Sequence, residues 1–469
     1  MASDSARMGA GRLVRPFASL ALSIGVALAF VLATPVIGWA HASLVSSDPA
    51  ANSLLHAAPS RVRLVFSEAL EPSLGRISLV GSDGVVVKLA AAGDPHDVNA
   101  LVAPLAQPLR SGAYRIAWRV VSADGHPVDG SYVFTVELPA DAATGAVPPA
   151  PMEPAPPPPS EMHDTHDMHD GVSWGPTLAG APLVPALLRG LAVGTLMAAA
   201  GLIAFLAFVR DASGERPRRP EALARWLSVA AVVLLVLHHA AWAINAYPEH
   251  RFGADMLGVM LTTGVGRAEL LRSGLALLGV WGIVLARRPR LALPFSIAAL
   301  LVSGYTGHAT VLHPMWTTPA KAVHLVAGAV WLGGLLWLLA LERADATRFE
   351  REAAHVSSAA LSAVLLVTIS GLVQTLLFLP SPLDLVRSAY GAISLAKIAG
   401  LLVLVGFGAH HKFRVLPALA GDAGRSARFI TSLRQEVVVM SIVVLLGGLL
   451  GYVPPPTGAH VSPSHALAR

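Results

Sequence analysis

Residues 183–209 read LVPALLRGLAVGTLMAAAGLIAFLAFV, an apolar stretch interrupted by a single charged side chain, Arg189. A helix needs about 20 consecutive apolar residues to cross the hydrocarbon core of a bilayer, so this stretch predicts a transmembrane helix. Seven further stretches have the same character: 223–245, 268–286, 291–311, 320–341, 357–379, 389–409 and 435–453. The sequence therefore predicts an all-α polytopic membrane bundle of eight transmembrane helices over residues 181–455.

The distribution of arginine and lysine predicts how this bundle is oriented, because cytoplasmic loops carry an excess of both residues. Every second connection is rich in arginine, beginning with Arg210, Arg216, Arg218, Arg219 and Arg225. The alternate segments hold only Arg251, Arg267, Arg272, Lys321 and Arg387. Both ends of the bundle are thus expected outside the cytoplasm, with residues 456–469 as an extracytoplasmic tail.

Composition excludes several classes of protein. The chain has 469 residues, of which 54% are hydrophobic and 13% charged, too apolar for a purely soluble protein. The net charge of +5 does not indicate nucleic-acid binding, because the arginines lie between apolar segments. There is no cysteine, so disulfides, thiolate zinc sites and cysteine nucleophiles are excluded. Any site for a soft metal ion would therefore depend on methionine and histidine.

The N-terminal segment has the features of a secretory signal peptide. Arg12 and Arg15 precede an apolar run over 17–37, and Gly38 and Ala40 provide the small residues of a cleavage site. Cleavage after Ala40 removes residues 1–40 and makes His41 the first residue of the mature chain. Its α-amine and imidazole can then chelate one metal ion, and such nitrogen ligands suit copper(II).

Asp124 and His126 are candidates to complete this site. In an extended segment, residues two apart point to the same face, so this carboxylate and imidazole can approach one metal ion together. With His41 they would form a set of three nitrogens and one oxygen around copper(II). The alternative is a solvated turn before Gly130.

A linker over residues 139–180 separates this region from the apolar segments. It is rich in proline, which predicts an extended, semi-rigid spacer. The second half of the linker contains five candidate metal ligands: Met162, His163, His166, Met168 and His169. These residues would bind copper weakly in either oxidation state and relay it to the membrane. The alternative is an acidic tether without a metal.

Residues 41–138 resemble the CopC family of periplasmic copper-binding proteins. The resemblance rests on His41, residues 45–50 (VSSDPA), residues 64–68 (LVFSE), residues 112–118 and residues 122–127. It implies a small all-β sandwich or barrel, Ig-like, with His41, Asp124 and His126 as copper(II) ligands. It also places Glu68 near the metal, as in some members of the family.

Two local features accompany this resemblance. Residues 61–66 and 132–136 alternate or are rich in β-branched side chains, as strands are. Methionine is absent between His41 and Ala150, whereas the family's separate copper(I) site uses a methionine cluster. The outer domain is therefore expected to bind copper(II) alone.

Histidines near the outer ends of the predicted helices are candidates for a second metal site, because an ionisable side chain in a bilayer indicates function. Of 18 histidines, only His355, His410 and His411 are assigned to the inner side. The outer candidates are His238, His239, His308, His313 and His324. Each has the alternative of an interfacial histidine bonded to a carbonyl, favoured for His239, and His324 is also a candidate haem ligand.

Residues 181–455 resemble the CopD family of copper-resistance membrane proteins. The resemblance rests on Ser303-Gly304 with residues 307–309, on His324 with residues 331–334, on residues 390–391 with 395–397, and on residues 433–436. It implies copper uptake across the membrane, with His308 and His324 as the first candidate ligands and His238 and His313 after them.

Together these features predict a copper acquisition and homeostasis protein of the bacterial cytoplasmic (inner) membrane. Its periplasmic domain would bind copper(II) and pass it to the membrane domain for import, where copper(I) is also a candidate species. The expected partners are copper ions, the lipid bilayer and a copper chaperone or reductase, with no nucleic acid. No nucleotide-binding motif is present, so gradients or internal sinks would drive transport.

Three alternatives stay open. One is a haem-containing or redox membrane protein that reduces copper, and another is a copper sensor without transport. The third is an oxidative enzyme with an N-terminal histidine copper site. It is disfavoured because a domain of this size with an aspartate ligand offers little open coordination, so the chain is expected not to be an enzyme.

Overall fold

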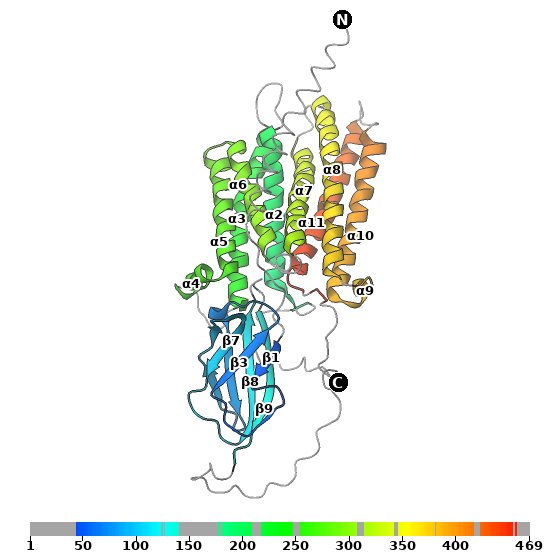
Figure 1. Ribbon diagram of the computed structural model, residues 1–469. Helices are drawn as coiled ribbons and strands as arrows, with labels where there is room; N and C mark the ends of the chain where they lie inside the picture. Colours follow the sequence, from blue (N-terminus) through cyan, green and yellow to red (C-terminus); the bar gives the residue numbers. More distant parts are fainter. Residues whose placement is uncertain are drawn as a thin grey trace. The chain divides into compact units, whose positions relative to one another are not determined.

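The computed structural model describes residues 44–122, 125, 127–139, 177–178, 181–208, 217–246, 254–306, 314–341, 346–379, 381–416, 423–453 and 455–456. The chain divides into two compact units (Figure 1). The β unit contains the strands of residues 44–136 together with residues 245–259, and the helical unit contains the other helices. Residues 1–40, the predicted signal peptide, and residues 457–469 of the predicted tail lie outside the described residues.

Two sheets make up the β unit. The first has the order β1 (Leu44–Asp48), β3 (Arg61–Phe66), β7 (Asp97–Pro104) and β6 (Ala92–Asp94). The second has the order β2 (Leu54–Leu55), β9 (Pro127–Val136), β8 (Gly112–Val121), β4 (Arg76–Gly81) and β5 (Val86–Leu89). The short helix η1 (Pro72–Leu74) lies between β3 and β4 in the chain. All pairs are antiparallel except β2 with β9.

Alternation of apolar residues explains why the two sheets pack face to face. Val62, Leu64 and Phe66 on β3 are buried, while the residues between them are not. They share one core with Ile116 on β8 and Phe134 on β9, from the other sheet. Each large apolar side chain buried in this way contributes about 1.5–3 kcal/mol. The all-β sandwich is thus confirmed, as are the strands predicted at residues 61–66 and 132–136.

The helical unit consists of long helices that run side by side (Figure 1). Their bounds are α2 (Leu183–Phe208), α3 (Arg218–Ala246), α4 (Ala254–Thr262), α5 (Gly264–Val280) continued by η3 (Trp281–Leu285), α6 (Pro289–Val302) continued by η4 (Ser303–Tyr305), α7 (Pro314–Ala340), α8 (Ala346–Phe378), α9 (Asp384–Arg387), α10 (Ala389–His410) continued by η6 (His411–Val415), and α11 (Ala423–Leu450). A two-residue pair, β10 (Thr177–Leu178) and β11 (Ala181–Pro182), precedes α2.

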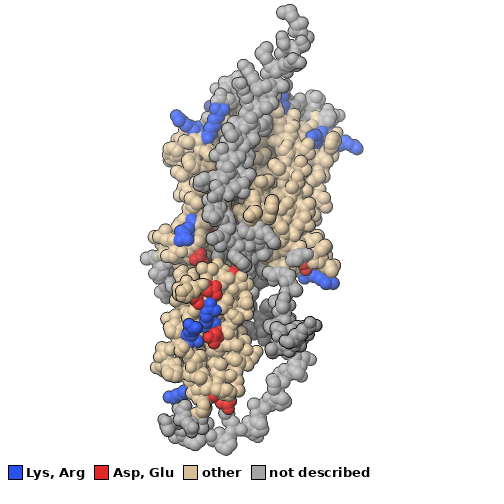
Figure 2. Space-filling view, in the orientation of Figure 1, with Lys and Arg blue, Asp and Glu red and all other residues tan. Residues whose placement is uncertain are grey.

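Each of the eight predicted apolar stretches overlaps one of the long helices. In the described part of the chain, seven helices are long and apolar enough to cross a membrane. The eighth segment, Pro289–Tyr305, is apolar but shorter. Figure 2 shows uncharged surface along the helical unit, with lysine and arginine at the ends of its helices. The chain is therefore a multi-pass membrane protein.

Helices α2 and α7 approach each other closely at the centre of this unit. A Cβ atom placed on Gly333 would lie 2.4 Å from the Cα atom of Gly201, so neither position has room for a side chain. Small residues that let backbones approach in this way are typical of helix contacts within membranes. The contact joins α2 to α7, the helix that also carries His324 and Trp331.

Candidate metal centre

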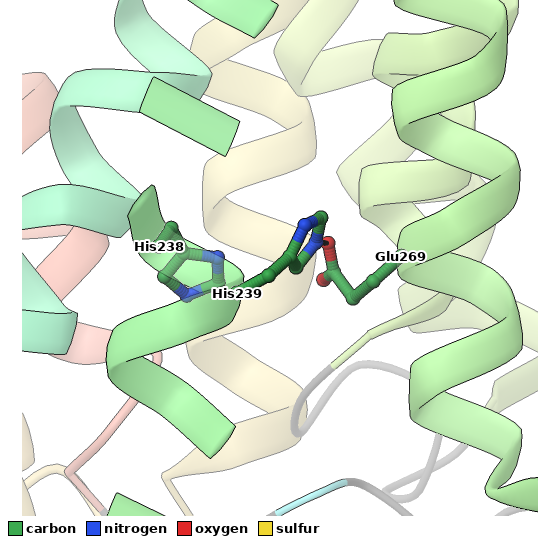
Figure 3. A group of neighbouring side chains, drawn as sticks. All are labelled: His238, His239 and Glu269. Carbon is green, nitrogen blue, oxygen red and sulfur yellow. Dashed lines mark hydrogen bonds and ion pairs between the residues drawn. The ribbon is translucent and has the colours of Figure 1, made fainter. Parts of the chain in front are cut away.

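Two helices of the helical unit, which is the membrane part of the chain and is also called the membrane unit, bring three candidate ligands together in its interior. His238 and His239 lie on α3 and Glu269 lies on α5. Their exposed fractions are 4%, 7% and 4%, so all three are buried. Each offers one ligand atom, and the three atoms lie within 4.8 Å of one another. Figure 3 shows the imidazole of His239 beside the carboxylate of Glu269, with His238 one residue back on the same helix.

The Glu269 carboxylate is the anionic side of this cluster. Its Oε2 forms a hydrogen bond with Nε2 of His239. It also accepts a hydrogen bond from the guanidinium of Arg272, one turn further along α5. Arg272 in turn donates to Oγ of Ser303 at 3.3 Å. A buried carboxylate is costly unless a charge and hydrogen bonds compensate it. Arg272 supplies that compensation while no metal ion is present.

His238 contributes a nitrogen that is not otherwise used. Its Nε2 lies 3.0 Å from the hydroxyl of Tyr452, which fixes the ring. Its Nδ1 is buried and has no hydrogen-bond partner among the residues that the structure describes. A buried nitrogen without a partner costs about 1–3 kcal/mol, and coordination of a metal ion would remove that cost. The contact between Nε2 of His238 and Tyr452 is also typical of metal-binding histidines, because the nitrogen that does not bind the metal is usually held by a neighbouring group.

The donor set determines which ions fit. Two imidazole nitrogens and one carboxylate oxygen suit copper(II), nickel(II) or zinc, and exclude a site that depends on sulfur. The cluster therefore has the ligands for a late first-row metal ion, in a part of the chain where ionisable side chains indicate function.

The other membrane candidates are placed differently. Nδ1 of His324, on α7, lies 3.1 Å from Oγ of Ser370 on α8. Among the described residues, His324 joins no group of three ligands; the one such group is that of His238, His239 and Glu269. His308 and His313 lie outside the described residues, as do the linker candidates from Met162 to His169.

In the β unit, Glu68 is fully buried, with an exposed fraction of 0%. The chain just after it runs beside the end of β8: Leu70 pairs with Ser122, and the N–H of Glu71 donates to the carbonyl of Val121 at 2.8 Å. Glu68 is thus held close to the segment that leads to the predicted ligands. Asp124 and His126, together with His41, lie outside the described residues.

Sequence reasoning missed two members of the membrane centre. Glu269 was not among the predicted ligands, and Arg272 was grouped with the charges of the outer segments, whereas the structure places both inside α5. The available signal was a charged pair, Glu269 and Arg272, one turn apart within an apolar segment. His239 was interpreted as interfacial, yet it is buried and bonded to Glu269.

Three family models match the chain. The CopC domain matches residues 44–137. The copper resistance protein D-like N-terminal domain matches residues 181–318, and the copper resistance protein D model matches residues 350–450.

Known relatives cover the same parts. Protein YobA of Escherichia coli (strain K12) is 40% identical over 124 residues, which are 26% of this chain and 99% of that protein. Copper transport protein CutJ of Bacillus subtilis (strain 168) is 25% identical over 411 residues, which are 82% of this chain and 70% of that protein. The crystal structure of CopC from Methylosinus trichosporium OB3b is 36% identical and covers 21% of this chain and 95% of that one, with a TM-score of 0.20. The chain belongs to the copper resistance and transport family in which a CopC domain is joined to CopD domains.

Proposed function

We propose that this protein captures copper(II) outside the bacterial cytoplasmic membrane and passes it to the membrane unit for import. Capture takes place in the β unit, at the α-amine and imidazole of His41 after cleavage at Ala40, with Asp124 and His126. The pairing of Leu70 with Ser122, two residues before Asp124, supports a place for Glu68 near this site. The family membership and the similarity to a copper transport protein support this assignment.

The observation that carries the membrane step is the buried cluster of His238, His239 and Glu269. A copper ion that reaches it binds Nδ1 of His238, which has no partner among the described residues, and replaces the hydrogen bond between His239 and Glu269. The linker residues from Met162 to His169 relay the ion to this centre. His308, His313 and His324 then serve as further ligands along the path.

Copper accumulation in living cells tests the proposal. Cells that express the wild-type chain should accumulate more copper than cells without it. Glu269→Gln keeps the size of the side chain but removes its charge, so it should reduce accumulation to the level of cells without the protein. His239→Ala should do the same. Neither variant should change the copper(II) affinity of the outer domain, because both residues lie in the membrane unit.

Glu352→Gln is the matched control. Glu352 is also a buried glutamate of the helical unit, on α8, but it is not part of the cluster. This variant should accumulate copper as the wild type does. Normal accumulation by Glu269→Gln would remove the centre from the transport path, and the proposed function would lose the observation on which it rests.

A further inference from the structure

A second pair of candidate ligands lies at the other end of the helical unit. His411 begins η6 at the end of α10, and Glu436 lies on α11. Their exposed fractions are 7% and 1%. Figure 1 shows that α3 ends, and that α10 begins after α9, at the same end of the helical unit. The end of α10, with His411, is therefore opposite to the end that holds His238 and His239.

The two oxygens of the Glu436 carboxylate have different neighbours. Its Oε1 accepts a hydrogen bond from Nε1 of Trp331 at 3.0 Å. Its Oε2 lies 3.2 Å from Nδ1 of His411, yet it receives no hydrogen bond from any described residue, since the direction of approach is unsuitable. Nε2 of His411 is 2.7 Å from Oγ of Ser432. Two potential ligand atoms thus face each other in the interior, and each is oriented by a neighbour on its far side.

This spacing fits a metal ion between the two atoms. An ion placed about 2.0–2.1 Å from nitrogen and oxygen, the usual length of such bonds, would form an angle of about 100° between them. That angle is compatible with tetrahedral coordination and with neighbouring positions of a tetragonal site. Nδ1 of His411 and Oε2 of Glu436 are close but are not aligned for a hydrogen bond, and Oε2 is buried. Both features are expected of two atoms that bind a metal ion between them.

The ligand pattern repeats that of the first centre. There, adjacent histidines on α3 meet a glutamate on α5; here, His411 on η6 meets Glu436 on α11, and His410, the residue before it, ends α10. The ring centroids of His238 and His239 are 5.7 Å apart, and those of His410 and His411 are 6.1 Å apart. His410 is exposed and does not yet join the other two. A change of its rotamer would supply a third ligand open to the solvent.

We propose that His411 and Glu436, with His410, form a second binding site for copper(II) or a similar divalent ion at the arginine-rich end of the helical unit. Trp331 and Ser432 position its ligands. Its role as the exit of an import path rests on the proposed function; the binding itself does not. The open side at His410 would release the ion to an acceptor on that face.

Counting bound copper in the purified full chain tests this inference. Equilibrium dialysis in detergent, at free copper(II) sufficient to fill the centre at Glu269, should give one ion fewer per chain in Glu436→Gln than in the wild type. His411→Ala should lose the same ion. His355→Ala should bind as the wild type does, because that histidine is exposed on α8. The double variant Glu269→Gln/Glu436→Gln should lose two ions.

Glu436→Gln retains an oxygen that can accept from Trp331, so its melting temperature in detergent should stay close to that of the wild type and confirm a folded chain. An unchanged copper count in folded Glu436→Gln would overturn the second site. That outcome is independent of cellular accumulation, since import can fail with both sites occupied, and the second site can be absent while import continues.

Discussion

Nε1 of Trp331 donates a hydrogen bond to Oε1 of Glu436 at 3.0 Å, which joins α7 to α11 inside the helical unit. The two residues belong to separate motifs, at residues 331–334 and 433–436, on which the resemblance to the CopD family rests. The structure shows that these motifs meet. One function of Trp331 is thus to hold a buried carboxylate in the position from which it faces His411.

Trp331→Phe should destabilise the protein more than a simple loss of volume would. The substitution removes the donor and leaves Oε1 of Glu436 buried without it, which costs about 1–3 kcal/mol and more for a charged group. The melting temperature in detergent measures this effect. Trp337→Phe is the matched control, because Trp337 is equally buried on α7 but its Nε1 has no hydrogen-bond partner among the described residues. Equal melting temperatures for the two variants would show that the bond to Glu436 contributes nothing.

Gly333→Ala should lower the melting temperature through overpacking. Its Cβ would lie 2.4 Å from backbone atoms of Gly201, so α2 and α7 must move apart. Overpacking of a tight interior costs about 1–3 kcal/mol. Gly406→Ala on α10 is the control, since a Cβ there meets no atom of the described chain within 4 Å. It should leave stability unchanged or raise it by about 0.5–1 kcal/mol, the usual gain from replacing a helical glycine by alanine.

The sequence predicted the architecture well because architecture follows from patterns within one segment. The apolar run at residues 183–209 corresponds to α2, and the alternation at residues 61–66 corresponds to β3. Neither prediction needs knowledge of what the segment contacts. The length of α6 was predicted less well: the predicted stretch reaches residue 311, whereas the chain leaves the α-helical conformation at Ser303, where small and polar residues follow the apolar ones.

The membrane centre was harder to predict because it depends on contacts between segments. Hydropathy identifies α5 as a membrane helix but does not reveal that Glu269 and Arg272 are buried in the interior of the helical unit. Nor does it reveal that His239, rather than His324, has a carboxylate beside it. Pairing across helices depends on rotation and depth, which a single sequence leaves open. The ligands His41, Asp124 and His126 stay predictions, because they lie outside the described residues.

Adding one residue before His41 in the mature chain should weaken copper(II) binding by the outer domain more than loss of the linker histidines does. An internal histidine has no free α-amine, so the chelate cannot form. Asp124→Ala and His126→Ala should each weaken binding as well. Titration with copper(II) of the full chain, compared with His163→Ala/His166→Ala/His169→Ala, measures the order of these effects. A greater loss from the linker variant would move the capture site away from His41.

Arg272→Gln should strengthen copper binding at the membrane centre. In the wild type, the guanidinium donates to the same oxygen of Glu269 that would bind the ion, and two positive charges then lie close together. At a separation of about 5 Å and an effective dielectric constant of about 20, unit charges repel by about 3 kcal/mol. Removal of the guanidinium should therefore raise the affinity about tenfold or more. It should also destabilise the metal-free protein, because Glu269 loses its compensating charge.

These two effects combine in one measurement, the rise in melting temperature when copper(II) is added to the protein in detergent. The rise should be larger for Arg272→Gln than for the wild type, since the metal replaces the lost cation. Arg267→Gln is the control: Arg267 lies on the same helix but is exposed, and this variant should respond to copper as the wild type does. A copper response of Arg272→Gln no larger than that of Arg267→Gln would mean that copper does not bind beside Glu269, and that Arg272 is a permanent structural partner rather than a substitute for the ion.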